Sequence, residues 1–259
     1  MKKIYLLLVF ISLNAFSQPF YLISENDQTG VGNICNFYNV SDCSKSPVNL
    51  CPANNTALSI AVNQTGNLYT SVDSKLMRQN QGETNCTQIG TFPQTSNNNF
   101  PLINALIADH SGNIYATGNK QNSPYDSRLY KYSSGNGITE LGVLPSQILS
   151  LGDLFFYENK LFLIGRDFSF STIFLIEVNI QNPSLSTIIT TLDVLPYGAF
   201  STYNNGVSKV YLTVRGFSAG KLYELDMNSF TTTLLNCPLE ALLNDAASYY
   251  PLSNPYKYY

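Results

Sequence analysis

The chain has 259 residues, of which only 12% are charged, and its formal net charge is −3. This small negative charge argues against nucleic acid as a partner, because phosphate binding needs a basic surface. The 18 Tyr and 15 Phe, with abundant Asn, Ser and Thr and no Trp, favour β-strands joined by polar turns over helices.

Residues 1–17 have the pattern of a secretory signal peptide. Lys2 and Lys3 precede an apolar run from Ile4 to Leu13, and a small-x-small site ends at Ser17. The run is too short to span a bilayer, and no later stretch is longer. We therefore expect cleavage near Ser17, a domain at 18–259 that is secreted or on the exterior of the cell envelope, and no membrane span. Losing both lysines lowers the net charge to −5.

A repeat dominates the remaining sequence. ALSIAVNQTGNLYTSV (57–72) matches NALIADHSGNIYATG (104–118), and an apolar-aromatic strand recurs with Tyr21, Tyr69, Tyr115, Phe162 and Tyr211 as its markers. These markers are 46 to 49 residues apart. A period of this size with several short strands per unit is typical of a β-propeller blade.

Four strands are predicted in each unit. A small-residue strand such as NALIAD or GDLFFY precedes the marker strand, and third and fourth strands such as RLYKYS and ITELGVLP follow it. The first unit lacks a small-residue strand, whereas residues 244–250 provide an extra one near the end of the chain. We therefore predict an all-β, five-bladed propeller of four-stranded blades, whose closing blade is built from both chain termini because an open ring would expose strand edges.

Several motifs resemble a known family. GDLFFYENKLFLIG (152–165), LIEVNIQNPSLSTII (175–189), YGAFSTYNNG (197–206), KLYELDMNSFTTTLLNCP (221–238) and the closing DAAS (245–248) are similar to the propeller domain of large secreted proteins of gliding Bacteroidetes, which often carry a C-terminal sorting domain for type IX secretion. The resemblance spans residues 18–250 and implies a propeller fold and export more than any activity. Because no sorting domain follows residue 250, a detached piece of a larger adhesin is one alternative.

Five cysteines leave an odd thiol in an exported chain. Cys35 and Cys51 lie symmetrically about Cys43, the expected tip of a hairpin. We predict a Cys35–Cys51 disulfide and a Cys43–Cys86 disulfide between neighbouring blades, with Cys237 free. No motif indicates a metal site or a cofactor.

His110 is the single histidine, and it lies beside Asp109 and Ser111. The preceding repeat has Asn63, Gln64 and Thr65 at these positions, followed in both copies by Gly and Asn. We therefore interpret the Asp-His-Ser sequence as a hairpin turn and not as a catalytic set.

A polar rim is a stronger candidate for function. The position four residues after each marker, where the second strand reaches the top face, is polar in every unit: Glu25, Asp73, Asn119, Arg166 and Arg215. Strand ends that meet solvent are usually polar, and this is the alternative explanation. In the functional interpretation these residues form a binding rim, with Phe168, Phe217 and Tyr125 of nearby loops as apolar platforms.

The small-residue strands provide a third set, Asn104, Asp153 and Asp245, near the axis. Two such carboxylates, or one with Glu25, could serve as acid and base in a five-bladed glycoside hydrolase. Trp, which often stacks on sugars, is absent, and no catalytic motif recurs. We therefore expect a monomeric binding or scaffold module for a saccharide or protein ligand without catalytic activity, and keep the hydrolase as the alternative.

Overall fold

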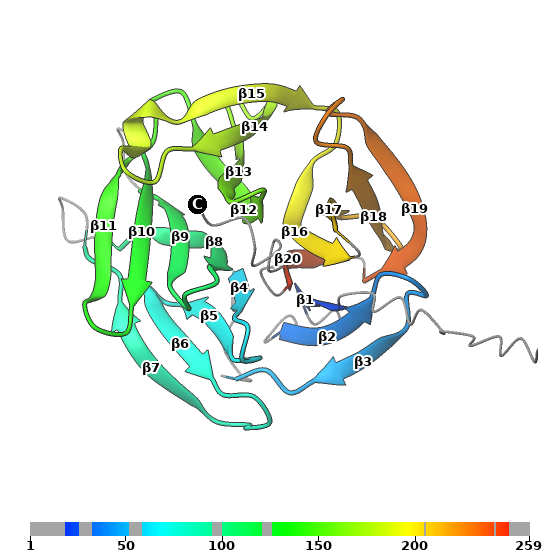
Figure 1. Ribbon diagram of the computed structural model, residues 1–259, viewed down its shortest axis with the longest axis horizontal. Helices are drawn as coiled ribbons and strands as arrows, with labels where there is room; N and C mark the ends of the chain where they lie inside the picture. The colour runs from blue at the N-terminus through cyan, green and yellow to red at the C-terminus, as the bar shows by residue number, and fades with distance from the viewer. Residues whose placement is uncertain are drawn as a thin grey trace, which may run out of the picture.

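The computed structural model describes residues 19–25, 33–51, 59–94, 100–120, 126–204, 206–240 and 242–248. These residues form five antiparallel four-stranded sheets arranged as blades around a central axis (Figure 1). The predicted five-bladed propeller is thereby confirmed. Within these ranges, no helix has the length and apolar character needed to cross a membrane. The predicted leader at 1–17 and Tyr125 lie outside the described residues.

We number the blades along the chain and give their strands from the axis outward. Blade 1 contains β20 (Leu243–Ser248), β1 (Pro19–Glu25), β2 (Asn33–Asn39) and β3 (Lys45–Val48). Blade 2 contains β4 (Ser59–Val62), β5 (Leu68–Val72), β6 (Lys75–Gln79) and β7 (Cys86–Thr91). Blade 3 contains β8 (Leu102–Ala108), β9 (Ile114–Asn119), β10 (Ser127–Ser133) and β11 (Gly137–Val143). Blade 4 contains β12 (Leu149–Tyr157), β13 (Lys160–Arg166), β14 (Ile173–Val178) and β15 (Thr187–Leu192), with a short 3-10 turn at Pro183–Leu185. Blade 5 contains β16 (Pro196–Asn204), β17 (Val207–Val214), β18 (Gly220–Leu225) and β19 (Thr232–Leu239).

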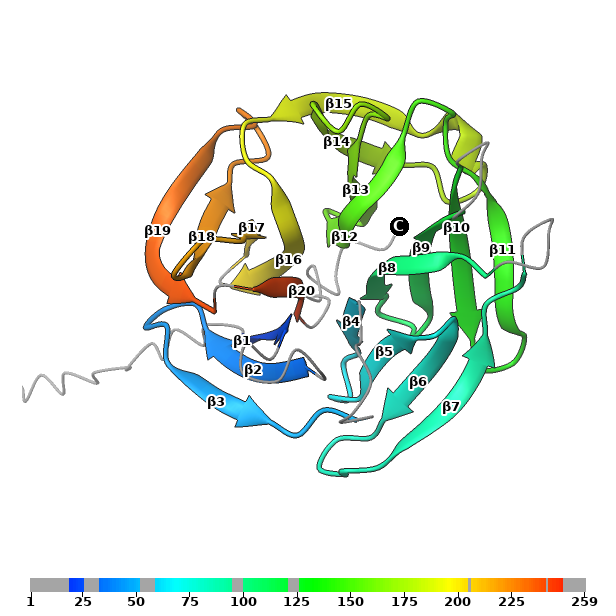
Figure 2. The ribbon, with the colours of Figure 1, turned by 180° about the vertical axis from the view of Figure 1, so that it is seen from behind.

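Position in the blade explains the composition of each strand. The first strands β4, β8, β12, β16 and β20 line the axis in both views (Figures 1 and 2), and each carries at least one Ala or Gly, such as Ala61, Gly152 and Gly198, where the five strands converge. The second strands are buried on both faces, as the uninterrupted burial of β5 shows, because each blade packs between two others. The outer strand β7 is largely exposed and correspondingly polar.

Both ends of the chain build blade 1, as predicted. β20 pairs antiparallel with β1, placing Ala247 opposite Tyr21. Phe20 of β1 stacks on Phe200 of blade 5, with ring centroids 4.2 Å apart. Closure therefore buries strand edges that an open ring would expose.

The Asp-His-Ser sequence forms the predicted turn between β8 and β9. The Asp109 carboxylate accepts hydrogen bonds from the backbone N–H groups of Ser111 and Asn113, both at 2.9 Å. In blade 2, Asn63 accepts the equivalent bonds from Thr65 and Asn67. The repeat thus preserves a turn that either side chain can hold.

The predicted cysteine pairs are wrong. Cys43 is bonded to Cys237, with Cα atoms 5.5 Å apart, whereas Cys35, Cys51 and Cys86 are free thiols. The reason is that residues 236–238 form an irregularity in β19, between its pairs with β18 at Leu235 and Leu239, and lie against the β2–β3 turn of blade 1, where Sγ of Cys43 is also 3.8 Å from the carbonyl oxygen of Asn236. This contact brings together residues 194 positions apart, which local symmetry about Cys43 could not reveal.

Candidate functional site

Two carboxylates meet at the centre of the propeller. Asp153 of β12 and Asp245 of β20 are both fully buried, and their side chains are hydrogen-bonded to each other. Burial raises the pKa of Asp153 to about 7. Burial and, second, the charge of Asp153 raise the pKa of Asp245 well above its usual range. Two carboxylates in contact cannot both ionise cheaply, so the pair holds a shared proton near neutral pH.

Each carboxylate also binds the backbone of two strands. Asp153 accepts N–H bonds from Leu154 in its own strand at 2.7 Å and from Ala199 of blade 5 at 2.8 Å. Asp245 accepts equivalent bonds from Ala246 at 2.8 Å and from Ile60 of blade 2 at 2.7 Å. The hydrogen bonds of the pair therefore connect blades 4, 5, 1 and 2 at the axis.

Gly198 makes room for this contact. It occupies the position of Asp153 and Asp245 in blade 5, between blades 4 and 1. A Cβ atom there would lie 2.6 Å from the backbone nitrogen of Ala246 and 2.7 Å from Oγ1 of Thr213. A side chain at this position would thus push β20, which carries Asp245, away from β16.

The sequence prediction that Asp153 and Asp245 lie near the axis agrees with this geometry, but their environment differs from that of a hydrolytic pair. Glycosidases need two accessible carboxyl groups about 5 to 10 Å apart, with substrate between them. Here the two groups touch each other and their oxygens are occupied by buried N–H donors. Asn104 also has a structural contact, because its side-chain amide donates to the carbonyl of Ser150 at 2.9 Å.

The five residues of the predicted rim have different environments in the structure. Asn119 links blade 3 to blade 4 through Ser150, whose N–H donates to its Oδ1 at 3.1 Å and whose carbonyl accepts from its Nδ2 at 2.7 Å. Asp73 is exposed in the β5–β6 turn with a positive φ of 46°. Glu25 and Arg215 form an ion pair of 3.2 Å. The five residues therefore do not converge on one centre.

Arg215 is used in holding blade 5 against blade 1. Its Nε donates to the carbonyl of Leu243 at 2.5 Å, and Nη2 donates to Oδ1 of Asn244 at 2.6 Å. The guanidinium carbon lies 4.3 Å from the ring centroid of Tyr197. With Glu25 also bound, three of the five N–H donors of this guanidinium are used within the protein.

Arg166 differs from Arg215 in having no salt bridge with any of the described residues. Its Nε is buried without a hydrogen bond to any of them. Burial lowers its pKa from the ordinary value, while Tyr197 and Asp167 oppose that shift. Its guanidinium carbon lies 3.8 Å from the ring centroid of Phe170. Arg166 is thus an oriented cation with unused donors.

The neighbouring loop is held in a defined shape. The Asp167 carboxylate accepts bonds from the hydroxyls of Ser169 and Ser171 and from the N–H of Ser171, and these bonds, first that of Ser169, lower its pKa. Asp167 is therefore turned toward its own loop. The same loop exposes Phe168 (41%) and Phe170 (60%), and the β17–β18 loop leaves Phe217 completely exposed.

Sequence reasoning identified Phe168 and Phe217 as exposed aromatics but missed Phe170 and Tyr197. Phe170 has a positive φ of 62°, so its ring turns back over Arg166, and nothing in the RDFSFS sequence indicates that conformation. Tyr197 precedes the marker strand of blade 5, and only the packing of neighbouring blades brings it between Arg166 and Arg215.

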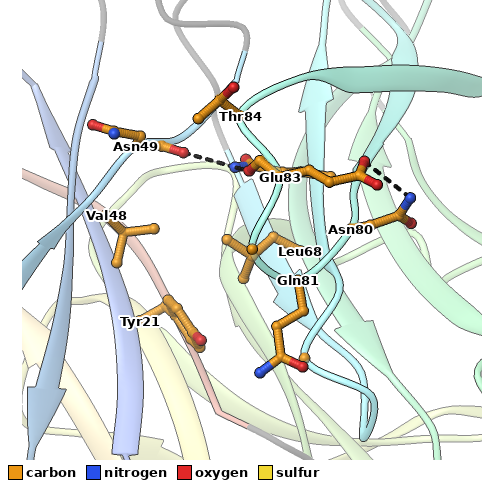
Figure 3. A pocket seen from close by; sticks show the side chains of 11 residues that line it. Tyr21, Val48, Asn49, Leu68, Asn80, Gln81, Glu83 and Thr84 are labelled. Atoms are coloured by element: carbon orange, nitrogen blue, oxygen red, sulfur yellow. Dashed lines mark hydrogen bonds between the residues drawn. The ribbon is translucent and has the colours of Figure 1, made fainter.

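A separate cavity of about 240 Å³ lies between blades 1 and 2 (Figure 3). Tyr21 and Val48 line it from blade 1, and Leu68 with the β6–β7 turn at 80–84 lines it from blade 2. Asn80 and Glu83 are hydrogen-bonded to each other at 3.1 Å on that turn (Figure 3). Among the described residues, no cluster of three or more His, Cys, Asp or Glu suits a metal ion here or elsewhere.

Comparisons with known proteins support the fold. No protein-family model matches the sequence, and no curated protein sequence matches it. The structure is similar to TolB from Acinetobacter baumannii, at 15% identity and a TM-score of 0.54, over 92% of this chain and 67% of that one. Weaker likenesses include a Bacteroides caccae protein of unknown function (10% identity, TM-score 0.47, 85% of this chain and 73% of that one). Another is the aldose sugar dehydrogenase of Streptomyces coelicolor in its PQQ-bound form (12%, 0.47, 66% and 60%). At 15% identity, the likeness to TolB supports the fold alone.

Proposed function

We propose that the protein is a binding module that recognises a carboxylate-bearing ligand, an acidic saccharide or an acidic peptide, on the top face of blades 4 and 5. The observation that carries this proposal is Arg166, a partly buried cation without a salt bridge among the described residues. A guanidinium presents paired N–H donors that match a carboxylate, and the bond is strong when it is partly shielded from water.

The aromatic side chains around Arg166 support the same ligand class. Phe170 stacks on the guanidinium and fixes its orientation. Phe168 and Phe217 expose apolar rings on adjacent blades, on which a sugar face or an apolar side chain can pack. The ligand therefore combines one carboxylate with an adjoining apolar surface.

Export is part of the proposal. The predicted signal peptide and the disulfide between Cys43 and Cys237 are both compatible with an oxidising compartment outside the cytosol. The sequence motifs similar to secreted propellers of gliding Bacteroidetes support the same location and suggest a role at the cell surface. We propose that the domain acts there as a monomer.

Arrays of acidic and neutral saccharides and of peptides test this function. Ligands found with the wild-type protein should bind Arg166→Ala at least tenfold more weakly, because a charge-assisted bidentate bond is lost. Arg166→Lys should recover only part of the affinity, since lysine keeps the charge but not the planar pair of donors.

Lys160→Ala is the matched control, because it removes one positive charge from an exposed hairpin on the opposite face. It should leave binding unchanged. Equal affinity of wild type and Arg166→Ala would refute the proposed site, and so would equal losses in both variants. The hydrolase alternative has no comparable support, since the inner carboxylates are buried and bonded to each other.

A further inference from the structure

Two crossings in the ring join blade 1 to its neighbours in the same way. In each, the end of an outer strand or the chain just after it contacts the third and fourth strands of the next blade or the turn between them. The first crossing runs from blade 5 to blade 1, and the second runs from blade 1 to blade 2. Each carries a cysteine followed by proline, Cys237-Pro238 and Cys51-Pro52.

The first crossing is fixed by polar contacts and a disulfide. Glu240, just after β19, accepts a hydrogen bond from the Tyr38 hydroxyl and one from the Asn36 amide at 2.9 Å. It also forms a salt bridge of 2.8 Å with Lys45. Cys237 is bonded to Cys43 in the β2–β3 turn.

The second crossing uses equivalent positions. Tyr21 lies opposite Phe37 and its counterpart Tyr69 lies opposite Arg78, so Gln79 corresponds to Tyr38. The Gln79 amide donates to the carbonyl of Asn49 at 2.7 Å, and its oxygen accepts the N–H of Cys51 at 3.0 Å. Figure 3 shows Asn49 beside Glu83 and Thr84 of the β6–β7 turn.

A second thiol, that of Cys86, lies at this crossing because Cys86 is paired with Gln79. Cys86 begins β7 directly opposite Gln79 in the register of blade 2. Gln79, whose side chain accepts the backbone N–H of Cys51, is therefore the cross-strand partner of Cys86. The two thiols are hydrogen-bonded to each other, and burial, with Cys86 as the second cause, raises the pKa of Cys51 to about 12.

We propose that Cys51 and Cys86 form a second inter-blade disulfide, the counterpart of the bond between Cys43 and Cys237. Both thiols lose their protons and together give two electrons to a disulfide oxidant such as oxidised glutathione. The Sγ–Sγ bond forms as the oxidant is reduced to two thiols. Cys86 is the more exposed of the pair and is the thiol that the oxidant reaches first.

The fifth cysteine is excluded from this exchange by its position. Cys35 is only 2% exposed and lies in the apolar cluster with Ile23 and Ile60. Burial raises the pKa of Cys35 to about 12, as it does for Cys51, so position and not thiolate content separates the two thiols. With the second bond formed, blade 1 is joined covalently to both neighbours, and this is the blade whose strands come from both ends of the chain.

Peptide mapping of the full chain tests the proposal. The protein is expressed with export, blocked with a thiol-alkylating reagent in denaturant at acidic pH, and digested with trypsin without reduction. Cleavage at Lys45, Lys75, Arg78 and Lys120 places Cys51 in fragment 46–75 and Cys86 in fragment 79–120. We expect these fragments linked, with the loss of two hydrogens, and a single alkylated cysteine, Cys35. Three alkylated cysteines, or fragment 46–75 linked to the peptide that contains Cys35, would overturn the proposal.

Two variants give an independent reading by thiol count. Cys35→Ala should leave no cysteine for alkylation without reduction, whereas Cys51→Ala should expose two, Cys35 and Cys86. The proposal requires one more alkylated cysteine in Cys51→Ala than in wild type; an equal or smaller number in the variant contradicts the bond. Because the wild-type map needs no substitution, it decides the question even where a variant fails to fold.

Discussion

The central aspartate pair makes its largest contribution by accepting hydrogen bonds from buried backbone N–H groups. In Asp245→Ala, the N–H groups of Ile60 and Ala246 lose bonds of 2.7 and 2.8 Å inside the propeller. Each unsatisfied buried donor costs about 1–3 kcal/mol, so the free energy of unfolding should fall by roughly 2–6 kcal/mol. Because the two donors belong to blades 2 and 1, the loss loosens the ring where it closes.

Urea denaturation followed by circular dichroism measures this change. Asp193→Ala is the control, because Asp193 is exposed and accepts one bond from Thr232 at the surface, so its loss should cost less than about 0.5 kcal/mol. If Asp245→Ala is destabilised no more than Asp193→Ala, the carboxylate does not clasp the strands. In that case the buried donors must find other acceptors.

Three further predictions concern the same ring. The folded protein keeps the proton that Asp153 and Asp245 share, because burial raises the pKa of both carboxyl groups. Stability should therefore fall as pH rises from about 5 to 7, by about 1.4 kcal/mol per pH unit for each retained proton, and a flat profile in denaturation series would contradict the shared proton. Gly198→Ala should lower the free energy of unfolding by roughly 1–3 kcal/mol through its clash with the neighbouring strand, and an unchanged denaturation midpoint would show that the strands can separate freely. Replacing both Cys43 and Cys237 by Ala should cost about 3–5 kcal/mol, since the bond closes a loop of 194 residues; equal urea midpoints for variant and wild type would show that closure does not depend on it.

The fold was predictable because the repeat places the same residue types at the same blade positions. Marker residues such as Tyr69 and Tyr115 lie in second strands, and residues 243–248 pair with β1 as the incomplete repeat required. The fourth strand of blade 1 was less predictable. It was expected to extend through Cys51, but β3 ends at Val48, where the chain departs toward blade 2.

The candidate site was only partly visible in the sequence. Repeat alignment located Arg166 and Arg215 at equivalent strand ends. Arg215 is bound by Glu25, Leu243 and Asn244, whereas Arg166 has no such partner within the described part of the chain. That difference arises from contacts between blades, which the period of the repeat does not encode. The cysteine pairing failed for the same reason, since it depends on where the outer strands cross.

Hydrogen exchange with and without the strongest array ligand tests the proposed binding face most directly. The account predicts slower amide exchange at 166–172 and 215–219, the loops that carry Arg166, Phe170 and Phe217. Exchange in the opposite turns at 63–67 and 109–113 should stay the same, and Arg166→Ala should lose the protection. Protection confined to the opposite turns, or retained in full by Arg166→Ala, would contradict the account.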